Sequence, residues 1–421
     1  MRSLLVLWAL AMILINSQFL KVEQDRIQAK IEQRVNVFSR VNPATNLIKL
    51  DSGDVVRPLA SCVVEAMKRG AEEMGSADSF RGRGPIEGYD FLLDAIVKGD
   101  YKSRKIKIGR DEIFVNHGSK EDLAGIGDIL CRDIRIAVVD PIYQTFVEAN
   151  VVGNRAGDLS QSSGWSHLIY LKCDASNGFI PELPSVRPDV IYLSFPCDPT
   201  GCAMTRKELE RWVKYAIAND ALILFDATYE SFITQDDVPH SIYEIKGARK
   251  VAIEFKSFSK CGGFTGLHCG YTVIPKDIEG YSFSSDRTAS LNVLWRRRQE
   301  IKNYSPAYVI QRGAESLYTE EGQAFVRENV SYYMRNASML LDVLSQTRLK
   351  HWGGVNSPYI WVESPYENSW KLFDKLLNEC HIVSSPGERF GSYGGGYVRL
   401  SAFADHTKVI MASTRISDLD I

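Results

Sequence analysis

Residues 190 to 225 read VIYLSFPCDPTGCAMTRKELERWVKYAIANDALILF, with an apolar run at each end. The runs 190–193 and 221–225 have the length and apolarity of strands buried on both faces of a parallel sheet. Between them, Thr205 and Glu208 form a capping-box pattern. The apolar residues that follow recur at helical spacing until Asn219 and Asp220; they are Leu209, Trp212, Val213, Ala216 and Ile217. The stretch predicts a strand–helix–strand unit, in which functional groups gather at the carboxyl ends of the strands.

The remainder of the chain repeats this alternation and then changes character. Further strand-like runs occupy 112–115, 134–139 and 251–255. After about residue 295 long polar-rich helices appear, followed by apolar runs at 359–362 and 397–400 and a helix near 368–379. We therefore predict an α/β protein with a large domain at 58–294, whose mostly parallel sheet is covered by helices. A smaller α+β domain is expected from 295–421 together with the N-terminal segment 12–57.

The composition favours a globular protein that binds small molecules. Of the 421 residues 45% are hydrophobic and 24% are charged, and the net charge is -2. This balance gives no basic excess that would indicate nucleic acid or an acidic membrane as the partner. The expected partners are small molecules or a second copy of the chain.

The cysteines and the N-terminus bear on metal content and location. The eight cysteines show no Cys-x-x-Cys pair and no zinc-finger spacing with histidine, so no metal is expected and the thiols are predicted to be reduced. The apolar run from Leu4 to Ile15 has the length of a signal-peptide core but is followed by no clean cleavage site. A cytoplasmic location is the favoured interpretation, and export is the alternative.

Two polar motifs lie directly after predicted buried strands. Asp226 begins Asp-Ala-Thr-Tyr229, and a buried carboxylate there requires a cationic partner, such as a protonated pyridine nitrogen. Taken alone, the motif is equally typical of a capped strand end. Lys260 ends Ser257-Phe-Ser-Lys, where a lysine with a lowered pKa would act as an amine nucleophile toward a carbonyl. Most lysines in such a position are simply exposed.

A third motif, Pro196-Cys-Asp-Pro-Thr-Gly201, places Asp198 in a loop after the strand at 190–193, although as a bare pattern it is typical of a turn. The three motifs in this order resemble the fold-type I aminotransferases and, in more detail, the LL-diaminopimelate aminotransferase family. The resemblance runs from Ile15 to Phe403 and includes Ser241-Ile-Tyr-Glu-Ile245, Gly263-Phe-Thr-Gly266 and Gln311-Arg-Gly-Ala314. It implies a seven-stranded sheet, pyridoxal 5′-phosphate (PLP) as cofactor, and a homodimer with shared active sites. It also implies that residues 1–11 are an N-terminal extension.

The resemblance assigns roles to residues that match the family pattern. Lys260 would hold PLP as a Schiff base and move a proton during catalysis, Asp226 would keep the pyridine nitrogen protonated, and Tyr229 would contact the phenolic oxygen. Arg399 would clamp the substrate carboxylate. The remaining matches are Ser119, Ser257 and Ser259 at the phosphate, Tyr143 over the ring, and Lys120 near cofactor and substrate.

Several site positions depart from the family pattern. His268 replaces an arginine at the phosphate, and Asp198 replaces an asparagine at the phenolic oxygen. Arg83 replaces a tyrosine that reaches the phosphate of the neighbouring subunit. At the substrate, the altered positions are Arg26 for a tyrosine, Ile86 for a glutamate, the loop around Gly53, and Asn303, which is shifted by one.

Two interpretations of these departures stay open. In the first, charge has moved: Arg83 or Arg26 replaces the lost phosphate contact, Asp198 pairs with one of them, and transamination survives. In the second, the fold survives with little or no turnover. The first predicts an aminotransferase, with LL-2,6-diaminopimelate/tetrahydrodipicolinate and 2-oxoglutarate/glutamate as the implied pairs on the lysine pathway. The alternatives are an aminotransferase for another basic or aromatic amino acid, or a binding or interaction subunit.

Overall fold

A computed structural model describes residues 13–22, 26–160, 164–366 and 368–421. Its larger body is built on a seven-stranded sheet with the strand order β2-β10-β9-β8-β7-β3-β6. The strands are β2 (Ile113–Asn116), β3 (Ile136–Asp140), β6 (Leu168–Lys172), β7 (Val190–Ser194), β8 (Leu222–Asp226), β9 (Ala252–Ser257) and β10 (Gly270–Val273). Only β10 runs antiparallel to its neighbours β2 and β9; the other pairs are parallel. The predicted α/β class with a mostly parallel sheet is confirmed.

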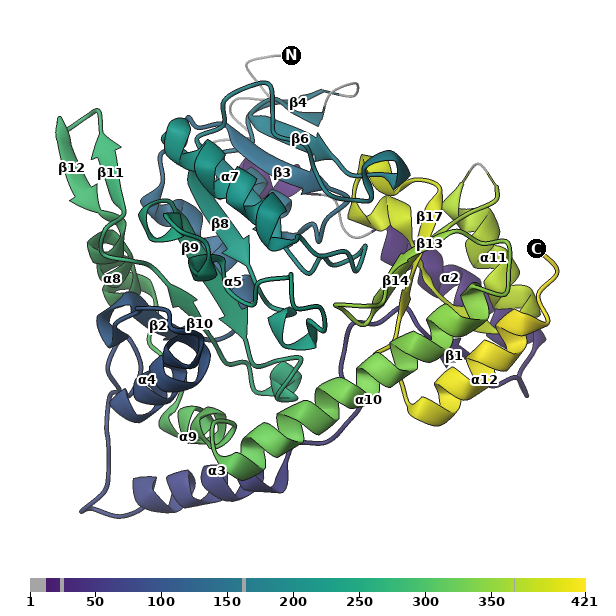
Figure 1. The fold of residues 1–421 in the computed structure, drawn as a ribbon, viewed down its shortest axis with the longest axis horizontal. Coiled ribbons are helices and arrows are strands. Elements are labelled where there is room, and N and C mark those ends of the chain that lie inside the picture. The colour runs from purple at the N-terminus through teal and green to yellow at the C-terminus, as the bar shows by residue number, and fades with distance from the viewer. Residues whose placement is uncertain (1–12, 23–25, 161–163, 367) are drawn as a thin grey trace.

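Helices cover this sheet on both sides, as Figure 1 shows with α7 lying across one face. They are α3 (Ser61–Met74), α4 (Asp90–Ile96), α5 (Ser119–Gly125), α6 (Thr145–Val152), α7 (Arg206–Ala218), α8 (Leu291–Lys302) and α9 (Tyr308–Ser316). A short π-helix, Val97–Tyr101, continues α4. The hairpin of β11 (Glu279–Ser282) and β12 (Arg287–Ser290) projects from the body beside α8 (Figure 1). The remaining short pair is β4 (Leu159–Ser160) with β5 (Gly164–Trp165).

Helix α7 begins where its capping box predicts. The Glu208 amide donates to the Thr205 hydroxyl oxygen at 3.3 Å, and the Thr205 amide donates to the Glu208 carboxylate at 2.7 Å. Four of the five apolar residues expected on its inner stripe are buried. The exception is Ile217, which lies in the last turn of the helix and is 43% exposed.

The smaller body is an antiparallel sheet packed against helices. Its strands are β13 (His351–Gly353), β14 (Tyr359–Glu363), β16 (Ser385–Pro386) and β17 (Tyr397–Ser401), in the order β13-β14-β17-β16. Its helices are α10 (Glu320–Leu344), α11 (Ser369–Glu379) and α12 (His406–Ser417). The N-terminal segment joins this body through α2 (Arg26–Val41), which packs on α11, and through β1 (Ile48–Lys49), which pairs with β15 (Ile382–Val383).

The two hydrophobic cores indicate where the bodies divide. Leu291, Trp295 and Ala314, from α8 and α9, lie in the core of the large sheet. Ala337 and Leu340, in the second half of α10, lie in the core of the small domain. Figure 1 shows α10 running from one body to the other. We therefore propose that the division falls within α10, later than the boundary expected between 294 and 295, because α8 and α9 bury their apolar faces on the large domain.

Candidate active site

The carboxyl ends of neighbouring strands bring the sequence motifs together. Asp226 is the last residue of β8 and pairs in register with Phe255 of β9, the strand that precedes Lys260. On the other side, Gly270 of β10 pairs with both Ser257 and Asn116. The loops that follow β2, β8 and β9 therefore open on one edge of the sheet, as a parallel α/β arrangement requires of a ligand site.

Lys260 holds its amine in a largely enclosed place. Its Nζ donates to the backbone carbonyl of Gly53 and lies 5.5 Å from the ring centroid of Phe403. Burial lowers the pKa of Lys260, while the charges of Asp198 and Asp54 act in the opposite direction. A lowered pKa increases the neutral fraction of the amine, which is the form that attacks a carbonyl.

The backbone around Lys260 is fixed by α10, a contact that the sequence motifs do not reveal. The side chain of Asn329 donates to the carbonyl of Lys260 at 3.3 Å and to that of Cys261 at 2.9 Å. Asn329 is itself buried. A single asparagine in a polar-rich helix carries no sequence signal for such a role, because only the packing of α10 brings it to this loop.

Asp226 is a buried carboxylate that accepts three hydrogen bonds, all from neutral donors. Its Oδ1 accepts from the Thr228 hydroxyl at 2.6 Å and from the Thr228 amide at 3.0 Å, and its Oδ2 accepts from Tyr192 at 3.1 Å. Burial raises the pKa of Asp226 although these hydrogen bonds oppose the shift. A cation placed against this carboxylate would offset the cost of burying its charge.

Tyr229 and Arg399 meet at Asp198. The hydroxyls of Tyr229 and Tyr359 share a hydrogen bond of 2.8 Å, and the Tyr229 hydroxyl lies 3.4 Å from Asp198 Oδ2. Arg399 Nη1 donates to Asp198 Oδ1 at 2.6 Å. The partner of Asp198 in this buried ion pair is thus Arg399, whereas the sequence suggests Arg83 or Arg26. The reason is that β17 brings Arg399 into contact with Asp198, while Arg83 and Arg26 are exposed on the surface.

Ser119 is linked to Asp226 through Thr228, whereas Ser257 and Ser259 contact each other. Ser119, the first residue of α5, shares a 3.0 Å hydrogen bond with the hydroxyl of Thr228, which itself donates to Asp226. The Ser259 amide donates to the Ser257 hydroxyl oxygen at 3.2 Å. His268, by contrast, is exposed and has a left-handed backbone with φ of 55°. Its expected place at the phosphate stays a prediction.

The other predicted site residues lie toward the surface of the single chain. Tyr143 is 46% exposed, and Lys120, Arg26 and Arg83 are exposed as well. The guanidinium of Arg83 lies 5.1 Å from the ring centroid of Tyr304. Asn303 donates to the carboxylate of Glu121 in α5 at 2.5 Å. Roles for these residues in cofactor or substrate binding stay predictions.

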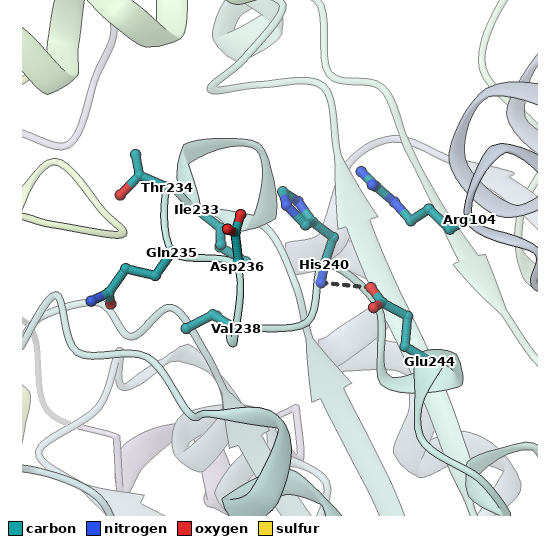
Figure 2. A pocket seen from close by; sticks show the side chains of 8 residues that line it. All are labelled: Arg104, Ile233, Thr234, Gln235, Asp236, Val238, His240 and Glu244. Carbon is teal, nitrogen blue, oxygen red and sulfur yellow. Dashed lines mark hydrogen bonds between the residues drawn. The ribbon is translucent and has the colours of Figure 1, made fainter.

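A pocket of about 220 Å³ lies elsewhere and contains none of the predicted site residues (Figure 2). It is lined by Arg104, Ile233, Thr234, Gln235, Asp236, Val238, His240 and Glu244. His240 bonds to Glu230 at 2.9 Å, and Glu230 lies 3.6 Å from the amine of the buried Lys256. Of the lining residues, His240 and Arg104 therefore pair with a charge cluster behind the pocket wall. Within the described residues, no group of three His, Cys, Asp or Glu side chains is placed to hold a metal ion.

Comparisons with known proteins agree with this arrangement. The family model for aminotransferase class I and II matches residues 45–412. An LL-diaminopimelate aminotransferase of Bacteroides thetaiotaomicron is 48% identical over 409 residues, which cover 97% of this chain and 100% of the relative. The chain belongs to the LL-diaminopimelate aminotransferase family. Another family member, from Methanosphaera stadtmanae, is 43% identical over 96% of this chain and 99% of its own length.

Solved structures extend the family comparison to the fold. The L,L-diaminopimelate aminotransferase of Chlamydomonas reinhardtii has a TM-score of 0.88 at 31% identity, covering 96% of this chain and 98% of that one. An aspartate aminotransferase of Thermus thermophilus has a TM-score of 0.81 at 18% identity, which shows the shared fold alone. Among the described residues, no helix has the length and apolarity needed to cross a membrane.

Proposed function

We propose that this chain is a PLP-dependent aminotransferase that moves an amino group between LL-2,6-diaminopimelate and 2-oxoglutarate, giving tetrahydrodipicolinate, glutamate and water, in either direction. The observation that carries the proposal is the grouping of the partly buried Lys260 with the buried Asp226 and Arg399, in a member of the LL-diaminopimelate aminotransferase family. These side chains supply an amine, an anion and a carboxylate receptor.

The charges and donors of this site suit the chemical groups of PLP. Asp226 is a buried anion that lacks a cationic donor among its recorded hydrogen bonds, which suits a protonated pyridine nitrogen. Lys260 presents an amine with a lowered pKa, which suits attachment to an aldehyde. Ser119, Ser257 and Ser259 would hold the phosphate. His268 provides less positive charge there than an arginine, so the phosphate is the weakest part of the fit.

When bound, PLP supplies an electron-withdrawing ring that stabilises negative charge on the substrate's α-carbon. The protein's own contribution is to hold protons and charges at stated atoms. Asp226 would hold a proton on the pyridine nitrogen. Lys260 Nζ, whose lowered pKa allows it to accept and return a proton, would move one beside the substrate. Burial raises the pKa of Tyr229, so its hydroxyl stays protonated and can donate to a cofactor oxygen.

Substrate recognition would be divided between Arg399 and residues that are partly or fully exposed. Arg399 is buried and would orient the carboxylate next to the amino group. Lys120, Tyr143, Gly53, Arg26 and Asn303 are proposed to complete the substrate site, with Arg83 reaching the site of a second subunit in a homodimer. Ile86 stands where the family pattern has a glutamate, so another basic or aromatic amino acid is the alternative donor. We propose a cytoplasmic location, since all eight cysteines are free thiols.

Absorption spectroscopy tests this proposal. Purified protein with added PLP is expected to show the visible band of a lysine-bound cofactor, and the band is expected to change on addition of LL-diaminopimelate or glutamate. Lys260→Ala is expected to lack the band, because it removes the only proposed point of attachment. Lys250→Ala, which alters an exposed lysine just before β9, is the matched control and should behave as the wild type.

The outcomes separate the open interpretations. If no band forms at saturating PLP, the protein is a binding or interaction subunit and the catalytic proposal fails. If the band forms and responds to other basic or aromatic amino acids but not to LL-diaminopimelate, the transamination chemistry stands and the substrate assignment fails.

A further inference from the structure

The ion pair between Asp198 and Arg399 occupies the group that is proposed to bind the substrate carboxylate. Arg399 is 5% exposed and Asp198 is 8% exposed. Their 2.6 Å contact is therefore formed in a place where water does little to weaken it. The charge of Asp198, together with the hydroxyl of Tyr359, raises the pKa of Arg399 even though burial opposes this, so the guanidinium is held as a cation by an anion of the same chain.

The remaining contacts of Arg399 leave little room for a second anion. Its Nη2 donates to the Asp51 carbonyl at 2.5 Å, and its Nε is buried without a hydrogen-bond partner. The guanidinium carbon lies 4.6 Å from the ring centroid of Tyr359 and 4.8 Å from that of Phe390. A carboxylate that binds an arginine in the two-point manner takes two N–H groups. It would have to share or displace a donor that Asp198 or Asp51 already uses.

We propose that Asp198 competes with the substrate's carboxylate for Arg399 and thereby sets the affinity of this site for carboxylates. This inference rests on the proposed function, because it assumes that Arg399 receives the carboxylate. A substrate must separate the Asp198–Arg399 pair or place its own negative charge beside Asp198. Both routes cost binding free energy, so Asp198 weakens the binding of donors whose carboxylate adjoins the amino group.

The electrostatic surroundings of Asp198 support a role at the reacting centre. Its charge acts on Lys260, Asp226 and Tyr229, which are the three residues proposed to handle the cofactor. A carboxylate ligand at Arg399 would thus enter a site that already contains an internal anion. Removing that anion while keeping the side chain's shape isolates its effect.

The experiment measures binding of maleate, a dicarboxylate with no amino or keto group, by titration calorimetry on PLP-treated protein. Asp198→Asn is expected to bind maleate at least about tenfold more tightly than the wild type, since a buried competing charge has been removed. Asp198→Ser should also bind maleate more tightly than the wild type, and it replaces the asparagine variant in the test if that variant does not fold. Maleamide, the uncharged analogue, should show no such gain.

Asp54→Asn is the matched control. Asp54 also acts on Lys260 but is exposed and makes no recorded ion pair with Arg399. Its removal should change maleate affinity far less than that of Asp198. Equal or weaker maleate binding by Asp198→Asn and Asp198→Ser would overturn the proposal and show that Asp198 orients Arg399 instead. Because maleate is not transaminated, this result is independent of whether the protein turns over LL-diaminopimelate.

Discussion

Asp226 connects the stability of the fold to the cofactor binding that we propose. Asp226 is the last residue of a strand in the buried sheet. Its carboxylate accepts hydrogen bonds from Tyr192 and Thr228, which are both neutral. Burial raises the pKa of Asp226 above its unfolded value. A raised carboxyl pKa gives stability that is fully present below the unfolded pKa and is lost as the pH rises through the folded pKa. At neutral pH the cofactor-free protein therefore carries a cost at this position.

We expect Asp226→Asn to raise the melting temperature of the cofactor-free protein near pH 7, by about 1–3 °C, because the amide avoids burying a charge. The advantage should shrink as the pH is lowered toward the unfolded pKa, since the wild-type carboxyl becomes neutral there. With PLP added the order should reverse, because only the wild-type carboxylate stabilises a protonated ring. Melting curves with and without PLP measure both effects. A variant that gains as much stability from PLP as the wild type would contradict the proposed role.

At the scale of elements, the loop that carries Asp198 is held against the small domain by two glycines. Gly201 has a left-handed backbone with φ of 69°, and a Cβ there would overlap the carbonyl oxygen of Tyr359 and lie 2.9 Å from the Cα of Gly353. Gly353 has φ of 79° and packs back on the same loop. This close approach of the 196–201 loop to β13 and β14 is what brings Asp198 within 2.6 Å of Arg399.

We expect Gly201→Ala to destabilise the protein by about 1–3 kcal/mol, because it combines backbone strain with a backbone clash. It should also weaken PLP binding, since Asp198 would be displaced and so would Tyr229, whose hydroxyl contacts that of Tyr359. Denaturant unfolding and a PLP titration measure these effects. Gly178→Ala is the matched control: Gly178 has a similar φ of 61°, but its Cβ would meet nothing within 4 Å. Equal losses in the two variants would mean that strain alone, and not the contact between domains, matters at Gly201.

At the scale of the molecule, the site lies between two bodies and its outer residues face solvent. Arg83, Lys120 and Tyr143 are exposed in the single chain, although they are proposed to act at the active site. The N-terminal segment also exposes a run of large apolar side chains, namely Ile13, Leu14, Ile15, Phe19 and Leu20. A second copy of the chain would cover such a surface and complete the site.

We expect the protein to sediment at twice its chain mass of 47.3 kDa. The double variant Phe19→Ser, Leu20→Ser should shift the equilibrium toward the monomer, because it removes apolar area from the proposed interface. Ile410→Ser, on the exposed face of α12, is the control and should leave the mass unchanged. Sedimentation over a range of concentrations distinguishes these cases. A wild-type protein that stays monomeric at high concentration would contradict the shared-site arrangement.

The sequence alone determined the buried strands, the capped helix between 205 and 219, and the positions of Lys260 and Asp226 at the carboxyl ends of strands, since apolar runs and caps are local. The ion-pair partner of Asp198 was decided only by the tertiary structure. Its partner Arg399 lies 201 residues away, on a strand of the other domain. The attachment of α8 and α9 to the large core was likewise decided there. The pairing of two charges, and the core that a helix joins, depend on how elements far apart in the sequence pack together. Local sequence patterns do not contain this information.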